Sequence, residues 1–198
     1  MIYGISGKKG TGKDLIGKIL RSKLEGKYEI KKFADKLKDI VCLLIGCSRE
    51  DLENREFKNK ELSKEWWYWE HEGGLIPYNC STGTIDCKLI KSTPRLLLQR
   101  IGTEAMREII HPSIWINALF ADYNDNYSWL ITDVRFENEC KAIKDKGGIL
   151  IRVNRESDVI DNHPSETALD DYNDWDLVID NDSDIPTLIE KLNIINTI

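Results

Sequence analysis

The sequence predicts an α/β fold in which helices flank a central parallel sheet, and three observations support this prediction. The chain has 198 residues, enough for one domain with a full hydrophobic core. Short apolar runs alternate with longer runs of helical periodicity, an order typical of parallel sheets. A glycine-rich loop at residues 7–13 joins the first apolar run to the first helical run. We therefore expect a single domain over residues 1–198.

The order of elements follows from the spacing of apolar residues. Strands are expected at the short apolar runs, namely residues 2–6, 29–33 (an edge strand), 128–133, 148–153 and 176–179. Helices are expected at residues 12–24, 34–45, 49–64 (charged and solvent-facing), 94–110, 113–123, 137–146 and 185–192. Residues 66–90 differ in character, because they hold three of the six tryptophans and a Gly-Gly pair. We interpret them as an inserted loop with a hairpin and a turn at Ser81-Thr82-Gly83.

Composition excludes several classes of protein. The formal net charge of −6 would repel nucleic acid, so a polyanion is not expected as a partner. No apolar run is long enough to cross a membrane, and no signal peptide precedes the first strand, so we expect a cytoplasmic protein. Five cysteines without paired spacing indicate reduced thiols. His71, Cys80 and Cys87 could supply three metal ligands, but no fourth ligand is apparent.

The glycine loop is the strongest functional signal. The stretch "ISGKKGTGKDL" matches the phosphate-binding pattern G-x-x-x-x-G-K-[ST] up to its last position. Backbone N–H groups and the positive end of the following helix converge there on phosphate oxygens. The candidate phosphate ligands are Gly7, Lys8, Lys9, Gly10, Thr11, Gly12 and Lys13. Asp14 stands where a magnesium-binding hydroxyl is usual, and Leu15 follows it.

Two carboxylates are candidate magnesium ligands. Asp133 ends the strand "WLITD", and ligands of an open parallel sheet bind outside the carboxyl ends of its strands. Magnesium retains several waters and needs one or two carboxylates besides nucleotide phosphates, so Asp14 and Asp133 could suffice. The alternative for Asp133 is a helix cap or a partner of Arg135.

Arginines and a glutamine supply the remaining candidates. Arg95 and Gln99 lie four residues apart on one helix face, where one can clamp a phosphate and the other can contact a base edge. Arg107 lies further along this helix and either faces the same cleft or is solvated. Arginines that could neutralise a transferring phosphoryl group are Arg135, Arg152 and Arg155, of which Arg152 has a structural ion pair as its alternative. The loop "DNHPSET" adds His163, Ser165 and Glu166, where Ser165 could be no more than a helix cap.

These segments together resemble the phage-type deoxynucleoside monophosphate kinases, relatives of adenylate and phosphomevalonate kinases with the P-loop kinase fold. The matching segments occur in the family's order and are "GKKGTGKD", "FADKLK", "TPRLLLQRIGTEAMREIIHPSIW", "ITDVRFENE" and "HPSE". In this family an aspartate commonly follows the loop lysine, so Asp14 resembles a family feature. Many members then have threonine, whereas this chain has Leu15.

The resemblance implies transfer of the γ-phosphoryl group of ATP to a deoxynucleoside 5′-monophosphate, with Mg²⁺. It implies that Lys13, Arg95, Asp133, Arg135 and Arg155 act in catalysis. By similarity to adenylate kinase, Arg95 and Gln99 hold the acceptor phosphate and base, within a helical acceptor-binding region at about 34–124. Trp69 is a candidate surface for stacking on the acceptor, and its alternative is a small satellite core.

Other functions compatible with the sequence are phosphorylation of another acceptor, as in dephospho-coenzyme A or phosphomevalonate kinases, and a non-catalytic ATP-binding regulatory module. Arg95 and Gln99 favour a nucleobase acceptor. The expected partners are small-molecule nucleotides, without nucleic acid or membrane, and a homodimer is left open.

Overall fold

The computed structural model describes residues 1–82, 86–124, 126–155 and 163–197. The chain forms two compact units. Met1–Asp35 and Ser113–Ile198 make the first, which we call the sheet unit, and Lys36–Pro112 make the second, the helix–hairpin unit. The expected acceptor-binding region at 34–124 is therefore longer than the second unit, because the helix after Pro112 belongs to the sheet unit.

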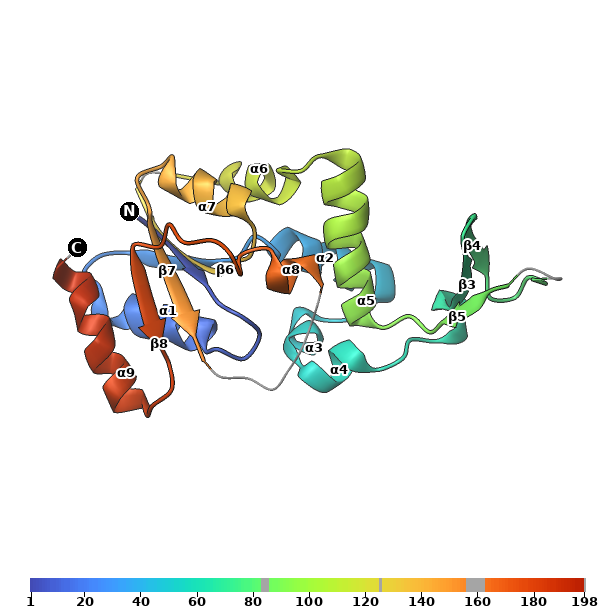
Figure 1. Ribbon diagram of the computed structural model, residues 1–198, viewed down its shortest axis with the longest axis horizontal. Helices are drawn as coiled ribbons and strands as arrows, with labels where there is room; N and C mark the ends of the chain where they lie inside the picture. The colour runs from blue at the N-terminus through green and yellow to red at the C-terminus, as the bar shows by residue number, and fades with distance from the viewer. Residues whose placement is uncertain (83–85, 125, 156–162, 198) are drawn as a thin grey trace. The chain divides into compact units, whose positions relative to one another are not determined.

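Five parallel strands form the centre of the sheet unit, in the order β2-β6-β1-β7-β8 (Figure 1). The strands are β1 (Ile2–Ser6), β2 (Tyr28–Lys31), β6 (Ser128–Val134), β7 (Ile149–Asn154) and β8 (Leu177–Asp180). Every pairing is parallel, and β2 is an edge strand as expected. The sequence-based prediction of an α/β fold with a central parallel sheet is thus confirmed.

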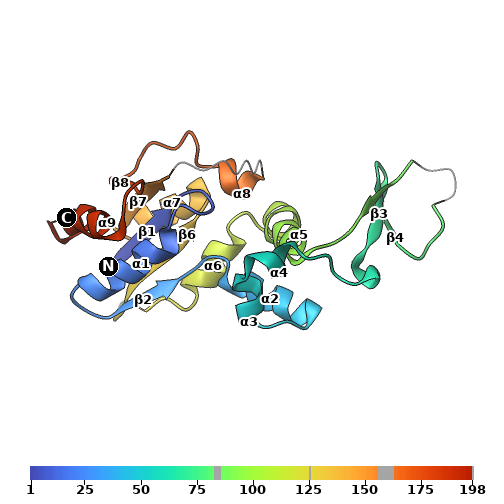
Figure 2. The same cartoon turned by 90° about the horizontal axis from the view of Figure 1, so that it is seen from below.

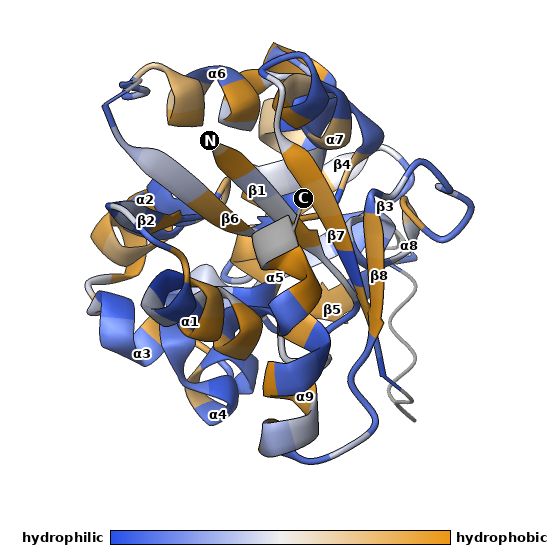
Figure 3. Cartoon of the chain, turned by 90° about the vertical axis from the view of Figure 1, so that its left-hand side faces the viewer, coloured by the Kyte–Doolittle hydropathy of each residue, from blue (hydrophilic) through white to orange (hydrophobic). Residues whose placement is uncertain are grey.

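Helices cover both faces of this sheet (Figures 1 and 3). One face carries α1 (Lys13–Lys23) and α9 (Ile185–Lys191), which continues as the 3₁₀ helix η3 (Leu192–Thr197), and the other carries α6 (Ile114–Phe120) and α7 (Glu137–Lys144). The apolar residues of β7 and β8 stand out along the strands in Figure 3. Side chains from β1, α1, β7 and α9 meet in one buried cluster that includes Ile5, Ile16, Leu20, Ile151 and Leu188. This core fixes the carboxyl ends of β1, β6 and β7, where the glycine loop begins.

The helix–hairpin unit contains short helices and a three-stranded antiparallel sheet. Its helices are α2 (Asp35–Ile45), which begins at the last residue of the sheet unit, α3 (Arg49–Glu53), α4 (Arg55–Asn59), the 3₁₀ helix η1 (Lys64–Trp66) and α5 (Pro94–Gln99). Its strands are β3 (Tyr68–His71), β4 (Gly74–Pro77) and β5 (Lys88–Ile90), in the order β4-β3-β5. The expected hairpin is present as β3 and β4, seen side on in Figure 2. The expected turn at 81–83 reaches outside the described residues.

Two helix predictions in this unit were wrong in detail. The single helix expected at 49–64 is broken at Asn54, whose backbone is extended and whose Oδ1 accepts bonds from the Glu56 and Phe57 amides. Asn54 therefore ends α3 and caps α4. The helix expected at 94–110 is α-helical only to Gln99 and continues as a π-helix, η2 (Arg100–Ile110). Its hydrogen bonds span five residues, as from the His111 amide to the Met106 carbonyl.

Among the described residues, no helix combines the length and apolar character needed to span a membrane.

Candidate functional site

The glycine loop connects the buried strand β1 to the first turn of α1. Gly12 caps α1 with a φ of 94°, in the left-handed region that favours glycine. A Cβ at this position would lie 2.6 Å from Nδ2 of Asn181, so the loop also needs a residue without a side chain here. The same Asn181 nitrogen donates to the Thr11 carbonyl at 2.8 Å, and Thr11 Oγ1 donates to the Lys8 carbonyl at 2.9 Å. The loop is thus braced both internally and from the residue that follows β8.

Lys13 is buried within this loop, with 9% of its surface exposed. Its Nζ donates to the carbonyls of Gly7, at 2.5 Å, and Lys8, at 2.7 Å. Burial, followed by the nearby Arg135 guanidinium, lowers the pKa of Lys13 to about 8. A buried ammonium group held only by neutral carbonyls in these bonds is well suited to pair with an incoming anion.

Asp14, in the first turn of α1, is bound on one oxygen by two side chains. Oδ1 lies 2.7 Å from Nζ of Lys32 and accepts a bond from the Thr132 hydroxyl at 2.9 Å. Partial burial opposes ionisation, but Lys32 and Thr132 together keep the pKa of Asp14 below its usual value. The side chain is 63% exposed, so a charged carboxylate stands next to the loop in contact with solvent.

Asp133 lies at the carboxyl end of β6 and binds the backbone that follows β2. Its Oδ1 accepts from the Phe33 amide at 2.8 Å, and its Oδ2 accepts from the Ala34 amide at 2.9 Å. Burial raises the pKa of Asp133 despite these two bonds. Each carboxylate oxygen keeps a second lone pair, so metal binding is compatible with this arrangement.

The two carboxylates therefore differ in how well they suit Mg²⁺, a hard cation that prefers charged oxygen ligands. Asp14 is ionised and exposed, whereas Asp133 is half-buried and engaged in connecting β6 to the segment after β2. Among the described residues, no cluster of three or more His, Cys, Asp or Glu side chains could hold a metal ion. A magnesium ion here would take ligands from Asp14, with Asp133 in a secondary role, and from a nucleotide's phosphates.

Arg135 follows β6 and contacts the one-turn helix α8 (Pro164–Thr167). Its Nη1 donates to the Ser165 carbonyl at 2.8 Å and to Oε1 of Glu166. Burial disfavours the charged guanidinium, but Glu166 outweighs this and raises the pKa of Arg135. Oε2 of Glu166 in turn accepts from the Lys9 amide at 3.1 Å. Glu166 thus connects Arg135 to the glycine loop.

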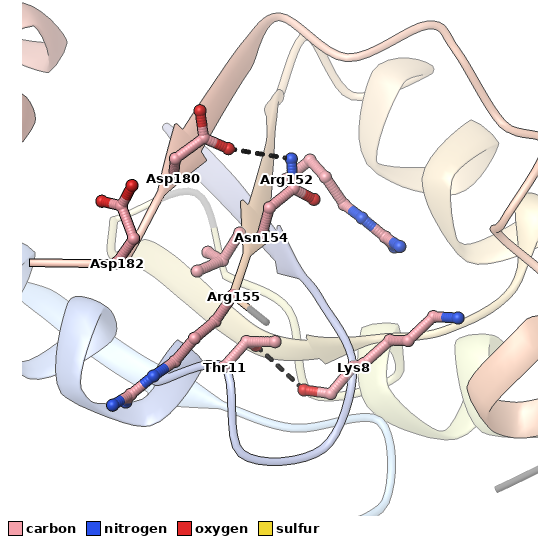
Figure 4. Close-up of a pocket in the computed structure, with 8 residues that line it drawn as sticks. Lys8, Thr11, Arg152, Asn154, Arg155, Asp180 and Asp182 are labelled. Carbon is pink, nitrogen blue, oxygen red and sulfur yellow. Dashed lines mark hydrogen bonds between the residues drawn. The ribbon is translucent and has the colours of Figure 1, made fainter. Parts of the chain in front are cut away.

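A cavity of about 710 Å³ borders the loop within the sheet unit (Figure 4). It is lined by residues from the glycine loop and from the ends of β7 and β8, namely Lys8, Thr11, Arg152, Val153, Asn154, Arg155, Asp180 and Asp182. The two aspartates lie at one side in Figure 4, where Asp180 accepts a bond from Asn154, and Lys8 extends toward the other. This volume lies within the range of small-molecule sites, and the lining offers donors and acceptors of both charges.

The arginines around this cavity are held differently. Arg152 contacts Ser6 Oγ at 3.3 Å, Asp170 at 3.8 Å and the Trp175 ring at 5.5 Å, which is the ion-paired arrangement considered as its alternative. Arg155 is exposed at the end of β7 and points away from Arg152 in Figure 4.

The candidates for acceptor binding all belong to the helix–hairpin unit and are half-buried. Nε of Arg95 donates to Oδ1 of Asn59 at 2.8 Å, and Gln99 lies one α-helical turn later. Arg107 lies in the π-helix, whose wider turn removes the four-residue spacing that would place Arg107 on the same face as Gln99. Nη1 of Arg107 donates to the Pro112 carbonyl at 3.4 Å.

Trp69 is part of a packed aromatic group on the hairpin. Its ring stacks on that of Tyr78 with centroids 6.2 Å apart, and Trp67 meets Tyr78 edge-on at 5.5 Å. The Trp69 indole N–H also donates to the Tyr78 carbonyl at 3.3 Å. These contacts match the satellite core considered as the alternative, while a role in stacking on a ligand stays a prediction.

The structure thus brings together one set of the predicted residues, comprising the glycine loop, Lys13, Asp14, Asp133, Arg135 and Arg155, in the sheet unit. Sequence reasoning missed Lys32, Thr132 and Asn181, which hold Asp14 and Thr11. The rule that ligands bind at the carboxyl ends of parallel strands could have found Lys32 and Asn181, because each directly follows a strand.

Comparison with known proteins gives three matches. The model of the deoxynucleotide monophosphate kinase family matches residues 81–192, more than half of the chain. A protein of Acanthamoeba polyphaga mimivirus, named as a deoxynucleotide monophosphate kinase, is 30% identical over an alignment of 207 positions that covers 97% of this chain and 94% of the relative. A deoxynucleoside-5′-monophosphate kinase of Escherichia phage T5 is 23% identical over an alignment of 215 positions that covers 85% of this chain and 85% of the relative.

Proposed function

Because the chain belongs to the deoxynucleotide monophosphate kinase family, we propose that it transfers the γ-phosphoryl group of ATP to a deoxynucleoside 5′-monophosphate. The observation that carries this proposal is the glycine loop with its buried lysine. Lys13 is charged near neutral pH and largely removed from water, and its direct hydrogen-bond acceptors among the described residues are loop carbonyls. A triphosphate would bring its phosphate oxygens directly to this ammonium group.

The donor nucleotide is proposed to bind across the loop and the adjoining cavity. Loop amides and Lys13 would hold its phosphates, and the cavity beside Thr11 and Arg155 would hold its nucleoside. A volume of about 710 Å³ is adequate for a group of that size.

Mg²⁺ is proposed to accompany the donor and would supply charge neutralisation of the phosphate oxygens. The ionised and exposed Asp14 is the side chain best suited to hold it. Lys32 and Thr132 keep that carboxylate in place at the start of α1.

The acceptor is proposed to bind through Arg95 and Gln99 of α5. A guanidinium pairs with a phosphate through two parallel hydrogen bonds, and a carboxamide offers both a donor and an acceptor to a base. Asn59 orients Arg95 from α4. Arg107 and Trp69 are proposed to contribute less, given their packing within the unit.

The chemistry needs alignment and charge stabilisation more than proton transfer. The acceptor phosphate is itself the nucleophile and is largely ionised near neutral pH, so no general base is required. Charge that develops on the transferring group is proposed to be met by Lys13 and Arg135, with Arg155 at the cavity edge. The proposed partners are small-molecule nucleotides in the cytoplasm, and a homodimer is left open.

Release of ADP tests the proposal directly. Purified protein is incubated with ATP, Mg²⁺ and each common nucleoside or deoxynucleoside monophosphate in turn, and ADP is measured by a coupled assay. We expect turnover that depends on a deoxynucleoside monophosphate. Turnover that no monophosphate stimulates would refute the kinase assignment, and stimulation by ribonucleotides alone would refute the deoxynucleotide preference.

A further inference from the structure

Glu166 carries a nearly buried carboxylate that is bound to the glycine loop. Its side chain is 10% exposed. One oxygen accepts from the backbone amide of Lys9, and the other accepts from Nη1 of Arg135. The three groups come from distant parts of the chain, since 157 residues separate Lys9 from Glu166.

Both partners of Glu166 are groups that bind phosphate. A backbone N–H of a glycine-rich loop and an arginine guanidinium are the donor types that hold phosphate oxygens in such sites. A carboxylate resembles two oxygens of a phosphate in charge and geometry. Glu166 therefore occupies donors that a triphosphate bound in this loop would use.

The electrostatic surroundings also mark Glu166 as a counter-ion of the loop. Burial and Arg135 lower the pKa of Lys13, and Glu166 is the first of the nearby carboxylates that oppose this shift. Glu166 thus offsets part of the positive charge of Lys13 and Arg135, and Asp14 and Asp133 add to this effect at Lys13. Arg135 has a second contact, with the Ser165 carbonyl, so its guanidinium would remain held at α8 if Glu166 moved away.

We propose that Glu166 occupies the glycine loop as an internal anion in the nucleotide-free protein, and that donor phosphates displace it and take over the Lys9 amide and Arg135. The inference rests on the proposed function, because it assumes that the loop binds a nucleotide. Displacing Glu166 costs free energy, so the measured affinity for the donor is weaker than the affinity of a loop from which Glu166 has already moved away. The benefit is that these two part-buried donors have an anionic acceptor both with and without a bound nucleotide.

The test is the affinity of the Glu166→Gln variant for ATP, ADP and inorganic pyrophosphate, measured by titration calorimetry without acceptor. Glutamine preserves the shape and one acceptor oxygen but removes the charge. We expect the dissociation constants to fall by about three- to tenfold. The variant weakens the charge-assisted bonds of residue 166 in the nucleotide-free protein, so displacing the side chain costs less free energy. Glu137→Gln is the matched control, because Glu137 is an exposed carboxylate at the start of α7, and its affinities should stay those of the wild type. Unchanged or weaker binding by a folded Glu166→Gln variant would overturn the inference.

A second measurement uses the wild-type protein, in case the variant does not fold. Pyrophosphate is titrated into isotope-labelled protein, and the amide resonances of Lys9, Ser165 and Glu166 are followed by NMR. Displacement predicts that all three shift together as the loop fills. Saturation that moves Lys9 but leaves Ser165 and Glu166 unchanged would contradict it. Absence of any binding of ATP, ADP and pyrophosphate to the wild type would instead refute the proposed function, so the two failures are distinguishable.

Discussion

The sheet unit and the helix–hairpin unit hold their candidate residues in different ways. In the sheet unit, Lys13 and Glu166 are nearly buried; Lys13 binds carbonyls of its own loop, and Glu166 binds that loop from 157 residues away. In the helix–hairpin unit, Arg95 is half-buried and bonded to the exposed Asn59. Removing one partner of a buried polar group costs much folding free energy, whereas an exposed pair contributes little to it. The proposed donor site around Lys13 is therefore formed before a ligand binds. The proposed acceptor site depends on Arg95, which is held weakly.

Lys13→Met should have the largest effect on activity. Methionine fills a similar volume but supplies no charge to the phosphates, and we expect kcat/KM to fall by about 10³-fold, typical of losing a preorganised electrostatic contact. ADP release against a saturating acceptor measures this. Lys18→Met is the control, since Lys18 is exposed on the same helix. A similar loss in both variants would assign the effect to damage of α1.

A pair of glycine variants compares the backbones of the two units. Gly12→Ala and Gly46→Ala both place a side chain at positive φ, of 94° and 68°, but only at Gly12 would the new Cβ meet another atom, Nδ2 of Asn181. We expect Gly46→Ala to cost about 1–2 kcal/mol of folding free energy, and Gly12→Ala to cost about 2 kcal/mol more because of overpacking. Urea denaturation measures both. Equal costs would show that the loop around Gly12 relaxes freely.

The folding free energy should depend on pH through Lys13. The unfolded chain has an ordinary lysine pKa of 10.5, whereas the folded chain releases the proton near pH 8. Unfolding therefore takes up a proton between these values, and rising pH stabilises the folded wild type relative to Lys13→Met. Between pH 7 and 9.5 we expect this difference in unfolding free energy to change by about 2 kcal/mol, from urea titrations of both proteins. A difference independent of pH would mean that the pKa of Lys13 is not depressed.

Arg95→Ala should weaken the use of the acceptor alone. We expect its KM to rise by about 10- to 30-fold, as for the loss of a charge-assisted pair, with donor binding unchanged. Steady-state kinetics in both substrates measure the two effects. Arg55→Ala is the control, because Arg55 is an exposed arginine on the neighbouring α4. An effect of Arg95→Ala confined to ATP would show that α5 does not hold the acceptor.

Arg100→Gln should have the smallest effect. Arg100 joins η2 to the hairpin through Glu70 at 2.6 Å, and it lies over the Tyr68 ring at 5.3 Å. Both charged side chains are about one third exposed, so we expect a loss of no more than about 1 kcal/mol. Hydrogen exchange of the β3 amides measures this loss of stability at the hairpin. A much larger loss would show that this pair, unlike Arg95 and Asn59, is fixed as firmly as the contacts of the sheet unit.

The sequence allowed much of the sheet unit to be predicted, because apolar runs mark its strands and apolar residues at helical spacing mark its main helices. The glycine loop, Asp14 and Asp133 were found from spacing and from their place after a strand. The break at Asn54 was missed because a capping side chain competes with helix propensity locally, and charge pattern alone does not show it. The change to a π-helix after Gln99 was missed because apolar periodicity does not distinguish a hydrogen bond over five residues from one over four.

The partners of the candidate residues were harder to predict. Asp133 was expected to face a metal, and its two bonds to the Phe33 and Ala34 amides depend on how β2 and β6 are paired. Glu166 was noted only as part of a short motif. Its contact with Lys9 joins positions 157 residues apart, and a single sequence carries no signal for such a pair.

The bond from Asn181 to the Thr11 carbonyl has a consequence for the order of folding. It spans 170 residues, and β6 and β7, the strands that pair with β1, both follow the whole helix–hairpin unit in the sequence. Contacts between such distant positions form late in folding, because the entropy of closing a long loop is lost before any contact stabilises it. On a ribosome, the helix–hairpin unit would be complete while β1 still lacked its neighbours. We expect a nascent chain to acquire nucleotide binding only after Asn181 has emerged from the ribosome.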